Sequence, residues 1–304
     1  MLSSSRAFVA VAAVAMAVLA GCGDSDSGSQ LGSSDDDRPT VVVTTNILGD
    51  VVANLVGDEM KVVTIMPVGA DPHDFQASAQ QVEQIETAGV LIVNGGGFEE
   101  GLLDVIESAV ADGVPTFEAI SAVDANLDDP HFFADPSRML HAASGIAGFL
   151  EEHVVGLDGV ALQANADAYI AELEALDAEI ESTLAQIPEA RRVLVTNHEV
   201  FGYFADRYDF EVVGTVIPRG TTVGGASAGD LAQLVEVIER EGVPAIFADT
   251  SSSDELPATL ADEVGEIEVV ELFSESLGDG DSDGSTYVDM MRANANRIAA
   301  ALAG

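Results

Sequence analysis

Short apolar runs alternate with helical patterns along most of this chain, and this alternation restricts the fold more than any other feature. Eight runs have the length and composition of strands, at residues 41–45, 61–65, 90–94, 114–117, 193–197, 211–216, 244–248 and 267–271. Helical patterns lie between them, at 47–56, 78–88, 136–153, 228–241 and 287–302. Strands separated by helices are typical of parallel sheets with helices on both faces. The sequence therefore predicts an α/β fold of two lobes, each with a mostly parallel four-stranded sheet.

One long helical pattern separates the two groups of strands. No turn signal interrupts residues 158–187 after Gly159, and apolar residues recur at steps of three and four: Ile170, Leu173, Leu176, Ile180, Leu184 and Ile187. About 30 helical residues would extend roughly 45 Å, which suits one rigid helix joining two lobes, although two shorter helices with a kink would fit the same pattern. We expect an N-terminal lobe at 39–157, a connecting helix at 158–188 and a C-terminal lobe at 189–304.

The first residues have the features of an export signal. An apolar stretch at 7–19 follows Arg6, is too short to span a bilayer, and ends in Leu-Ala-Gly-Cys at residues 19–22. This ending resembles a bacterial lipobox, in which Cys22 is lipidated; an ordinary cleaved signal with an accidental cysteine is the alternative. We expect a signal peptide at 1–21 and, at 22–38, the lipidated cysteine with a flexible acidic tether. The protein would then be anchored to the outer face of the cytoplasmic membrane.

Charge and cysteine content exclude several classes of function. The chain has 53 acidic and 11 basic residues and a formal net charge of -42, which argues against nucleic-acid binding because that needs a basic surface. Its single cysteine rules out an intramolecular disulfide and a cysteine-based zinc site.

The histidines suggest a metal site. Two of the five follow Asp-Pro, as His73 and His131, and a third, His198, follows the strand-like run 193–197. Proline restricts its own backbone and that of the preceding residue, so a histidine directly after Asp-Pro is held in place. Neutral imidazole is a common metal ligand, and sites in α/β folds form at the carboxyl ends of strands. We expect the three to meet between the lobes, whereas His141 and His153 fit a surface or structural role.

Several motifs resemble the solute-binding lipoproteins of zinc and manganese ABC importers, and they cover essentially the whole mature chain. They are VTTNILGD at 43–50, MPVGADPHDF at 66–75, NGGGFE at 94–99, DPHFFADP at 129–136 and NHEVFGY at 197–203, in the family's order. The resemblance implies that His73, His131 and His198 are metal ligands and that the long helix connects the lobes.

The fourth ligand implied by the resemblance is Glu275, at a position where the family usually has aspartate. Glutamate is a competent oxygen donor but is one methylene longer; a solvated loop acid, or Asp279 as the ligand instead, are the alternatives. Three imidazoles and one carboxylate suit four-coordinate Zn²⁺, whereas Mn²⁺ prefers more oxygen ligands. Zinc is therefore favoured, with manganese as the second candidate.

The function implied by the resemblance is binding without catalysis. Such a protein captures the metal outside the cytoplasmic membrane and, as a monomer, hands it to an ABC importer permease and its ATPase. A secreted zinc hydrolase is the rival hypothesis, but the sequence has no His-Glu-x-x-His motif. A surface adhesin is a third possibility, which is compatible with metal binding.

Overall fold

The computed structural model describes residues 38–124, 129–217, 222, 226–253, 255–265 and 267–304. The expected signal peptide, Cys22 and all of the tether except Arg38 lie outside the described residues. Within the described ranges, no helix combines the length and the apolar character needed to cross a bilayer.

Two parallel sheets of four strands each organise the described residues, which confirms the predicted fold class. The first sheet has the strand order β2-β1-β3-β4 and contains β1 (Thr40–Val43), β2 (Lys61–Thr64), β3 (Leu91–Val93) and β4 (Thr116–Glu118). The second has the order β6-β5-β7-β8 and contains β5 (Val193–Thr196), β6 (Glu211–Thr215), β7 (Ala245–Asp249) and β8 (Glu268–Leu272). The two sheets therefore have the same topology, and each pairing between neighbouring strands is parallel.

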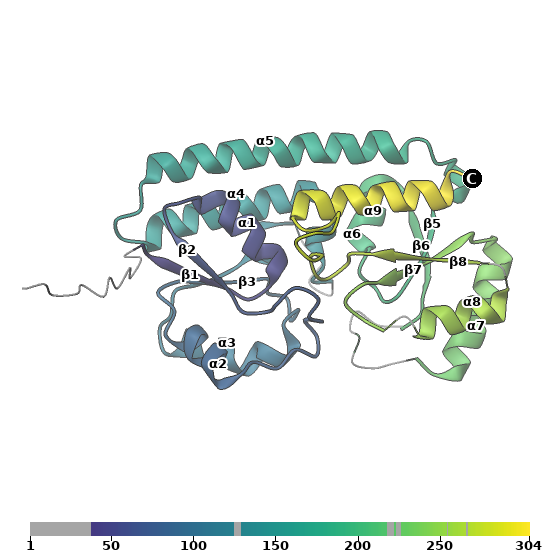
Figure 1. Ribbon diagram of the computed structural model, residues 1–304, viewed down its shortest axis with the longest axis horizontal. Helices are drawn as coiled ribbons and strands as arrows, with labels where there is room; N and C mark the ends of the chain where they lie inside the picture. Colours follow the sequence, from purple (N-terminus) through teal and green to yellow (C-terminus); the bar gives the residue numbers. More distant parts are fainter. Residues whose placement is uncertain (1–37, 125–128, 218–221, 223–225, 254, 266) are drawn as a thin grey trace, which may run out of the picture. The chain divides into compact units, whose positions relative to one another are not determined.

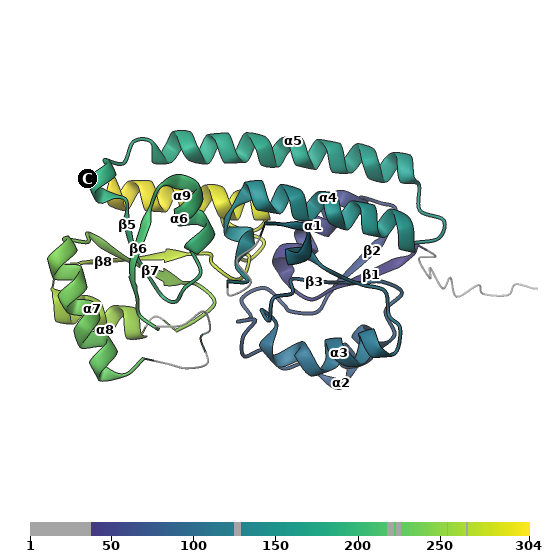
Figure 2. The same ribbon diagram turned by 180° about the vertical axis from the view of Figure 1, so that it is seen from behind.

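Helices cover both faces of each sheet (Figures 1 and 2). They are α1 (Asn46–Val56), α2 (Ala79–Glu86), α3 (Leu103–Ala111), α4 (Pro136–His153), α5 (Gly159–Leu184), α6 (Gly202–Tyr208), α7 (Ala228–Glu241), α8 (Glu255–Val264) and α9 (Tyr287–Leu302). Short 3₁₀ turns lie at Glu100–Leu102, Ala119–Ala122, Phe132–Ala134 and Glu189–Arg191. Side-chain caps explain where several helices begin. Ser78 and Ser227 form capping boxes at the starts of α2 and α7, and Asp135 caps α4 and precedes a proline in its first turn.

Alternate residues of the central strands enter different cores, as the two-residue period of a strand requires. In β1, Val41 and Val43 join a large core that continues through α1, α4, α5 and α9, whereas Val42 joins a smaller core under α2 and α3. In β7, Phe247 joins the large core and Ile246 joins a third core under α7 and α8. One face of each sheet thus contributes to the same apolar core.

The long helix α5 lies over this shared core as one unbroken helix of 26 residues, so the alternative of two kinked helices does not apply. It runs along α4 near one end and along α9 near the other (Figures 1 and 2). Of the apolar residues that predicted it, all but Ile170 are buried, and Tyr169 takes the buried position next to Ile170.

The strand order of the two sheets indicates where a ligand site should form. In each sheet the strand order reverses between the two central strands, β1 and β3 in one and β5 and β7 in the other. Ligand sites of open α/β sheets form at the carboxyl ends of strands at this reversal. The chain that leaves β5 leads within two residues to His198, and β7 ends at the buried Asp249.

Candidate metal centre

The three predicted histidines come from three separate loops and meet in the interior. His73 lies in the loop between β2 and α2, His131 just before the 3₁₀ turn Phe132–Ala134, and His198 just after β5. Their exposed fractions are 3%, 0% and 0%, and that of Glu275, in the loop after β8, is 2%. Buried ionisable groups need partners, and these four residues are partners for one another.

Their atoms converge on one point. The Glu275 Oε1 atom lies 2.7 Å from His73 Nε2, 3.3 Å from His131 Nε2 and 2.9 Å from His198 Nε2. One ligand atom from each of the four residues can be chosen so that all lie within 4.8 Å of one another. A tetrahedral zinc ion with bonds of about 2 Å spaces its ligand atoms about 3.3 Å apart, so small side-chain rotations would suffice to admit it.

The charges of this cluster are strongly coupled. Burial acts to raise the pKa of Glu275, but the interaction with His198 and the hydrogen bonds to the imidazoles outweigh burial and hold that pKa well below its usual value. Burial acts to lower the pKa of His131, but Asp129 and Glu275 outweigh it and raise that pKa to about 9. Burial also acts to lower the pKa of His73, but the hydrogen bond and the charge of Glu275 outweigh it and raise that pKa. The raised pKa values of His73 and His131 favour protonated imidazoles that compensate the buried carboxylate.

The outer nitrogens of two imidazoles are held by carboxylates. His131 Nδ1 lies 2.8 Å from Asp129 Oδ1, and the same oxygen accepts the backbone N–H of His131 at 3.0 Å. His73 Nδ1 lies 3.1 Å from Glu100 Oε1, whereas Asp71 accepts the backbone N–H of His73, at 2.9 Å, and not a ring nitrogen. A carboxylate on the outer nitrogen fixes the orientation of a ligating imidazole. Asp129 and Glu100 are therefore placed to orient two of the rings.

The third histidine is held differently. Among the described residues, the buried atoms His198 Nδ1 and Glu275 Oε2 have no hydrogen-bond partner. The nearby Asp249 is also buried, and it accepts the backbone N–H of Ser251 at 2.9 Å and the hydroxyl of Ser251 at 2.7 Å. Burial and then the charge of Glu275 raise the pKa of Asp249. A second buried carboxylate therefore lies within electrostatic range of His198 and Glu275.

Phe98 forms an aromatic wall of the site. Its ring centroid lies 5.5 Å from those of both His73 and His131. It follows a turn of three glycines with positive φ, in which a Cβ at Gly96 would lie 2.9 Å from Ile120. The buried Glu99 closes the turn by accepting the Asn94 N–H at 2.6 Å and the Gly95 N–H at 3.2 Å. The glycine-rich motif thus builds the wall behind two of the histidines.

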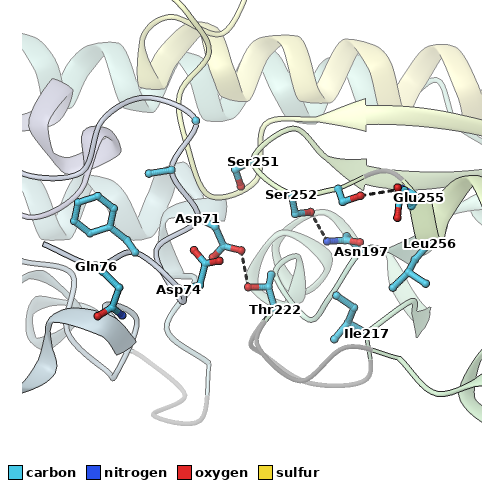
Figure 3. Close-up of a pocket in the computed structure, with 14 residues that line it drawn as sticks. Asp71, Asp74, Gln76, Asn197, Ile217, Thr222, Ser251, Ser252, Glu255 and Leu256 are labelled. Carbon is cyan, nitrogen blue, oxygen red and sulfur yellow. Dashed lines mark hydrogen bonds between the residues drawn. The ribbon is translucent and has the colours of Figure 1, made fainter.

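The described residues also form a cleft of about 800 Å³, whose lining side chains are drawn in Figure 3. It is lined on one side by the loop that carries His73 and on the other by Asn197 and the serines that follow β7. The Thr222 hydroxyl donates to Asp71 Oδ2 at 2.6 Å across the cleft, as Figure 3 shows. Asp74 and Asn197, which neighbour His73 and His198 in sequence, therefore line this cleft.

All four residues predicted as ligands lie together, and other candidates do not. Asp279 is exposed and is not part of the cluster, and His141 and His153 are exposed on α4. Sequence reasoning missed Glu100 and Asp249. The only available signal for Asp249 was its place at the carboxyl end of the predicted strand 244–248.

Curated proteins of similar sequence are metal-binding proteins by name. The zinc-binding protein TroA of Treponema pallidum is 32% identical over 88% of this chain and 90% of its own. The manganese-binding lipoprotein MntA of Halalkalibacterium halodurans is 29% identical over 94% of each chain. The metal ABC transporter substrate-binding lipoprotein SsaB of Streptococcus sanguinis is 27% identical over 97% of this chain and 98% of its own.

Structure and family comparisons agree with the sequence comparison. The solved structure of the periplasmic zinc-binding protein TroA from Treponema pallidum superposes with a TM-score of 0.81 at 29% identity, over 87% of this chain and 99% of that one. The model of the family described as zinc-uptake complex component A, periplasmic, matches residues 41–301. These findings confirm the resemblance that the motifs suggested. The chain belongs to the periplasmic zinc-uptake complex component A family.

Proposed function

We propose that this protein is an extracytoplasmic solute-binding protein that captures a divalent transition metal and delivers it to the permease and ATPase of an ABC importer. His73, His131, His198 and Glu275 are the proposed ligands, drawn from proposed lobes at 39–157 and 189–304 that the helix at 158–188 connects. The observation that carries the proposal is the convergence of three buried imidazole nitrogens on one carboxylate oxygen. Cys22, lipidated after removal of residues 1–21, would hold the protein at the outer face of the cytoplasmic membrane.

Zinc is the favoured cargo because three imidazoles and one carboxylate form a four-coordinate set. Manganese is the second candidate, since relatives of similar identity are named for either metal. A hydrolase would keep one metal position open for water, whereas Glu275, close to the three histidines, would fill the fourth position. Binding and transport are therefore proposed rather than catalysis.

The cleft is the proposed route of metal entry. Asp71, Asp74 and Glu255 line it, and carboxylates around a concave surface raise the local concentration of cations. Asp71 lies in the ligand loop two residues before His73, so an ion attracted to this part of the cleft would arrive close to His73.

The test is metal analysis of protein purified without chelator, followed by competition between Zn²⁺ and Mn²⁺. We expect one metal ion per chain and preferential retention of Zn²⁺. Retention of Mn²⁺ against equimolar Zn²⁺ would make manganese the cargo, and failure to bind either metal would overturn the proposal.

Replacing Glu275 tests the fourth ligand. Glu275→Ala is expected to lower Zn²⁺ affinity by about 100-fold or more, since losing a direct ligand should cost at least as much as the 10–100-fold typical of outer partners. Asp279→Ala, in the same loop but exposed, is the matched control and should bind like wild type. If Asp279→Ala has the larger effect in chelator competition, the assignment of Glu275 is wrong.

A further inference from the structure

The loop that carries Glu275 is hydrogen-bonded to α9 at its first residues. The backbone N–H of Phe273 donates to Asn294 Oδ1 at 2.9 Å, and Asn294 Nδ2 donates back to the carbonyl of Phe273 at 2.7 Å. Asn294 is buried, with an exposed fraction of 1%. The chain therefore leaves β8 in a defined direction two residues before Glu275.

The residues directly after Glu275 are bonded to the opposite lobe, around Asn46 at the start of α1. Asn46 Nδ2 donates to Ser276 Oγ at 3.0 Å and to the carbonyl of Pro67 at 3.1 Å. Asn46 Oδ1 accepts the N–H of Leu277 at 2.8 Å. The N–H of Gly69 donates to the same Ser276 hydroxyl at 2.7 Å. Pro67 and Gly69 belong to the loop that leads to His73, so one amide and one hydroxyl join this loop to the Glu275 loop.

This arrangement leaves its buried polar groups satisfied. Ser276 Oγ accepts two hydrogen bonds and donates a third to the carbonyl of Leu277 at 3.1 Å. Asn46 and Ser276 are both buried. Removing the Ser276 hydroxyl takes an acceptor from the N–H of Gly69 and from the Asn46 amide, and removing the Asn46 amide takes the acceptor of the Leu277 N–H. Donors left without a partner are costly in the interior. The network is thus specific for an amide at 46 and a hydroxyl at 276.

We propose that Asn46 and Ser276 are positioning residues that clamp the Glu275 loop to the His73 loop, so that carboxylate and imidazole are presented to the metal as one preorganised pair. The inference rests on the proposed function. Metal affinity depends on holding ligands within a few tenths of an ångström, and outer partners that do so typically contribute 10–100-fold. The longer side chain of glutamate has more rotatable bonds than aspartate, which makes backbone fixation directly beside it more important.

The clamp can be tested by Zn²⁺ affinity, measured by competition with a chromophoric chelator. Ser276→Ala and Asn46→Ala are each expected to weaken binding by about 10–100-fold. Asn54→Ala, exposed on the same helix as Asn46, and Ser282→Ala, whose hydroxyl bonds only within the Glu275 loop, are matched controls and should stay within about twofold of wild type. Should Ser276→Ala not fold, Asn46→Ala tests the same clamp from the other side.

A double-mutant cycle separates positioning from general stability. In a Glu275→Gln background, Ser276→Ala is expected to have a much smaller effect on Zn²⁺ affinity, because the carboxylate that Ser276 helps to present is absent and only the His73 side of the clamp remains. An equal loss in both backgrounds, or wild-type affinity of Ser276→Ala, would overturn the clamp while leaving the proposed function intact. Absence of Zn²⁺ binding by the wild-type protein would instead overturn the proposed function.

Discussion

At the scale of single residues, the pKa of His131 bears on metal binding, because this proposed ligand must lose a proton to coordinate an ion. Its carboxylate neighbours raise its pKa to about 9 from an ordinary 6.5, so in the metal-free protein it keeps its proton at neutral pH. The stabilising effect of this proton is fully present below pH 6.5 and is lost as the pH rises through about 9. A ligand must lose its proton to bind metal, so proton and metal compete throughout this range.

We therefore expect Zn²⁺ affinity to rise between pH 6.5 and 9, by up to about tenfold per pH unit for each proton released. Chelator competition across this range, with calorimetric titration in buffers of different ionisation enthalpy, would measure both the slope and the protons released. His141→Gln, on the exposed surface of α4, should leave the slope unchanged. A constant affinity from pH 6.5 to 8.5 would contradict this prediction.

Asp249 offers a second residue-scale prediction. Three neutral imidazoles and one carboxylate leave a bound divalent ion with one uncompensated positive charge. The buried Asp249 could help to compensate it, together with the Asp129 and Glu100 carboxylates behind two of the imidazoles. Asp249→Asn is expected to lower Zn²⁺ affinity by about tenfold while one ion per chain still binds. Asp262→Asn, an exposed acid in α8, is the control. Unchanged Zn²⁺ affinity of Asp249→Asn in chelator competition would show that the charge of Asp249 does not stabilise the bound metal.

The candidate ligands could be predicted from the sequence, but two of the acidic residues near them, Glu100 and Asp249, could not. His73 and His131 stand out because Asp-Pro precedes each one, and His198 because it ends a strand-like run. Glu100 and Asp249 reach the site only through the packing of strands distant in sequence, and no local pattern distinguishes them from the many other acids of the chain. Asp71 and Asp129 occupy equivalent places in their triplets, yet only Asp129 contacts the imidazole that follows it.

At the scale of elements, two glycines of α4 differ in the space available for a side chain. A Cβ at Gly145 would lie 2.8 Å from both Phe117 and Ala122, whereas a Cβ at Gly148 would meet nothing within 4 Å. Gly145→Ala is therefore expected to destabilise the protein by about 1–3 kcal/mol through overpacking. Gly148→Ala should stabilise it by about 0.5–1 kcal/mol, because alanine is the better helix former. Denaturant unfolding of the two variants would check the opposite signs, and equal signs would contradict the packing argument.

The strands and the long helices could be predicted closely, whereas the short helices α3, α6 and α8 could not. The expected bounds 136–153, 228–241 and 287–302 match α4, α7 and α9, because each spans several turns of regular apolar period. In α6 only 7 residues are helical, which is too few for such a period to emerge. In α5 the apolar residues recur with the period expected of a helix. Whether Tyr169 or Ile170 is buried, however, depends on the helices packed against α5, and Tyr169 is the buried one.

At the scale of the whole molecule, the lipobox-like ending predicts where the protein resides. Cys22→Ala removes the thiol that would carry the lipid, so the variant is expected in the soluble fraction of cells in which wild type sediments with membranes. Zn²⁺ affinity should not change, because residue 22 precedes the folded residues that hold the site. Fractionation followed by immunoblotting measures the distribution, and membrane retention of Cys22→Ala would argue for an anchor other than lipid.

The core shared by the two sheets has a thermodynamic consequence. Residues of both sheets, from Val41 to Phe247, join one apolar cluster under α5, so neither half can melt without exposing the interior of the other. Heat denaturation should then follow a single cooperative transition, with van't Hoff and calorimetric enthalpies that agree. A chain cut between the sheets would yield two fragments that each present an unprotected apolar face, and these should aggregate when expressed separately and recover solubility when refolded together.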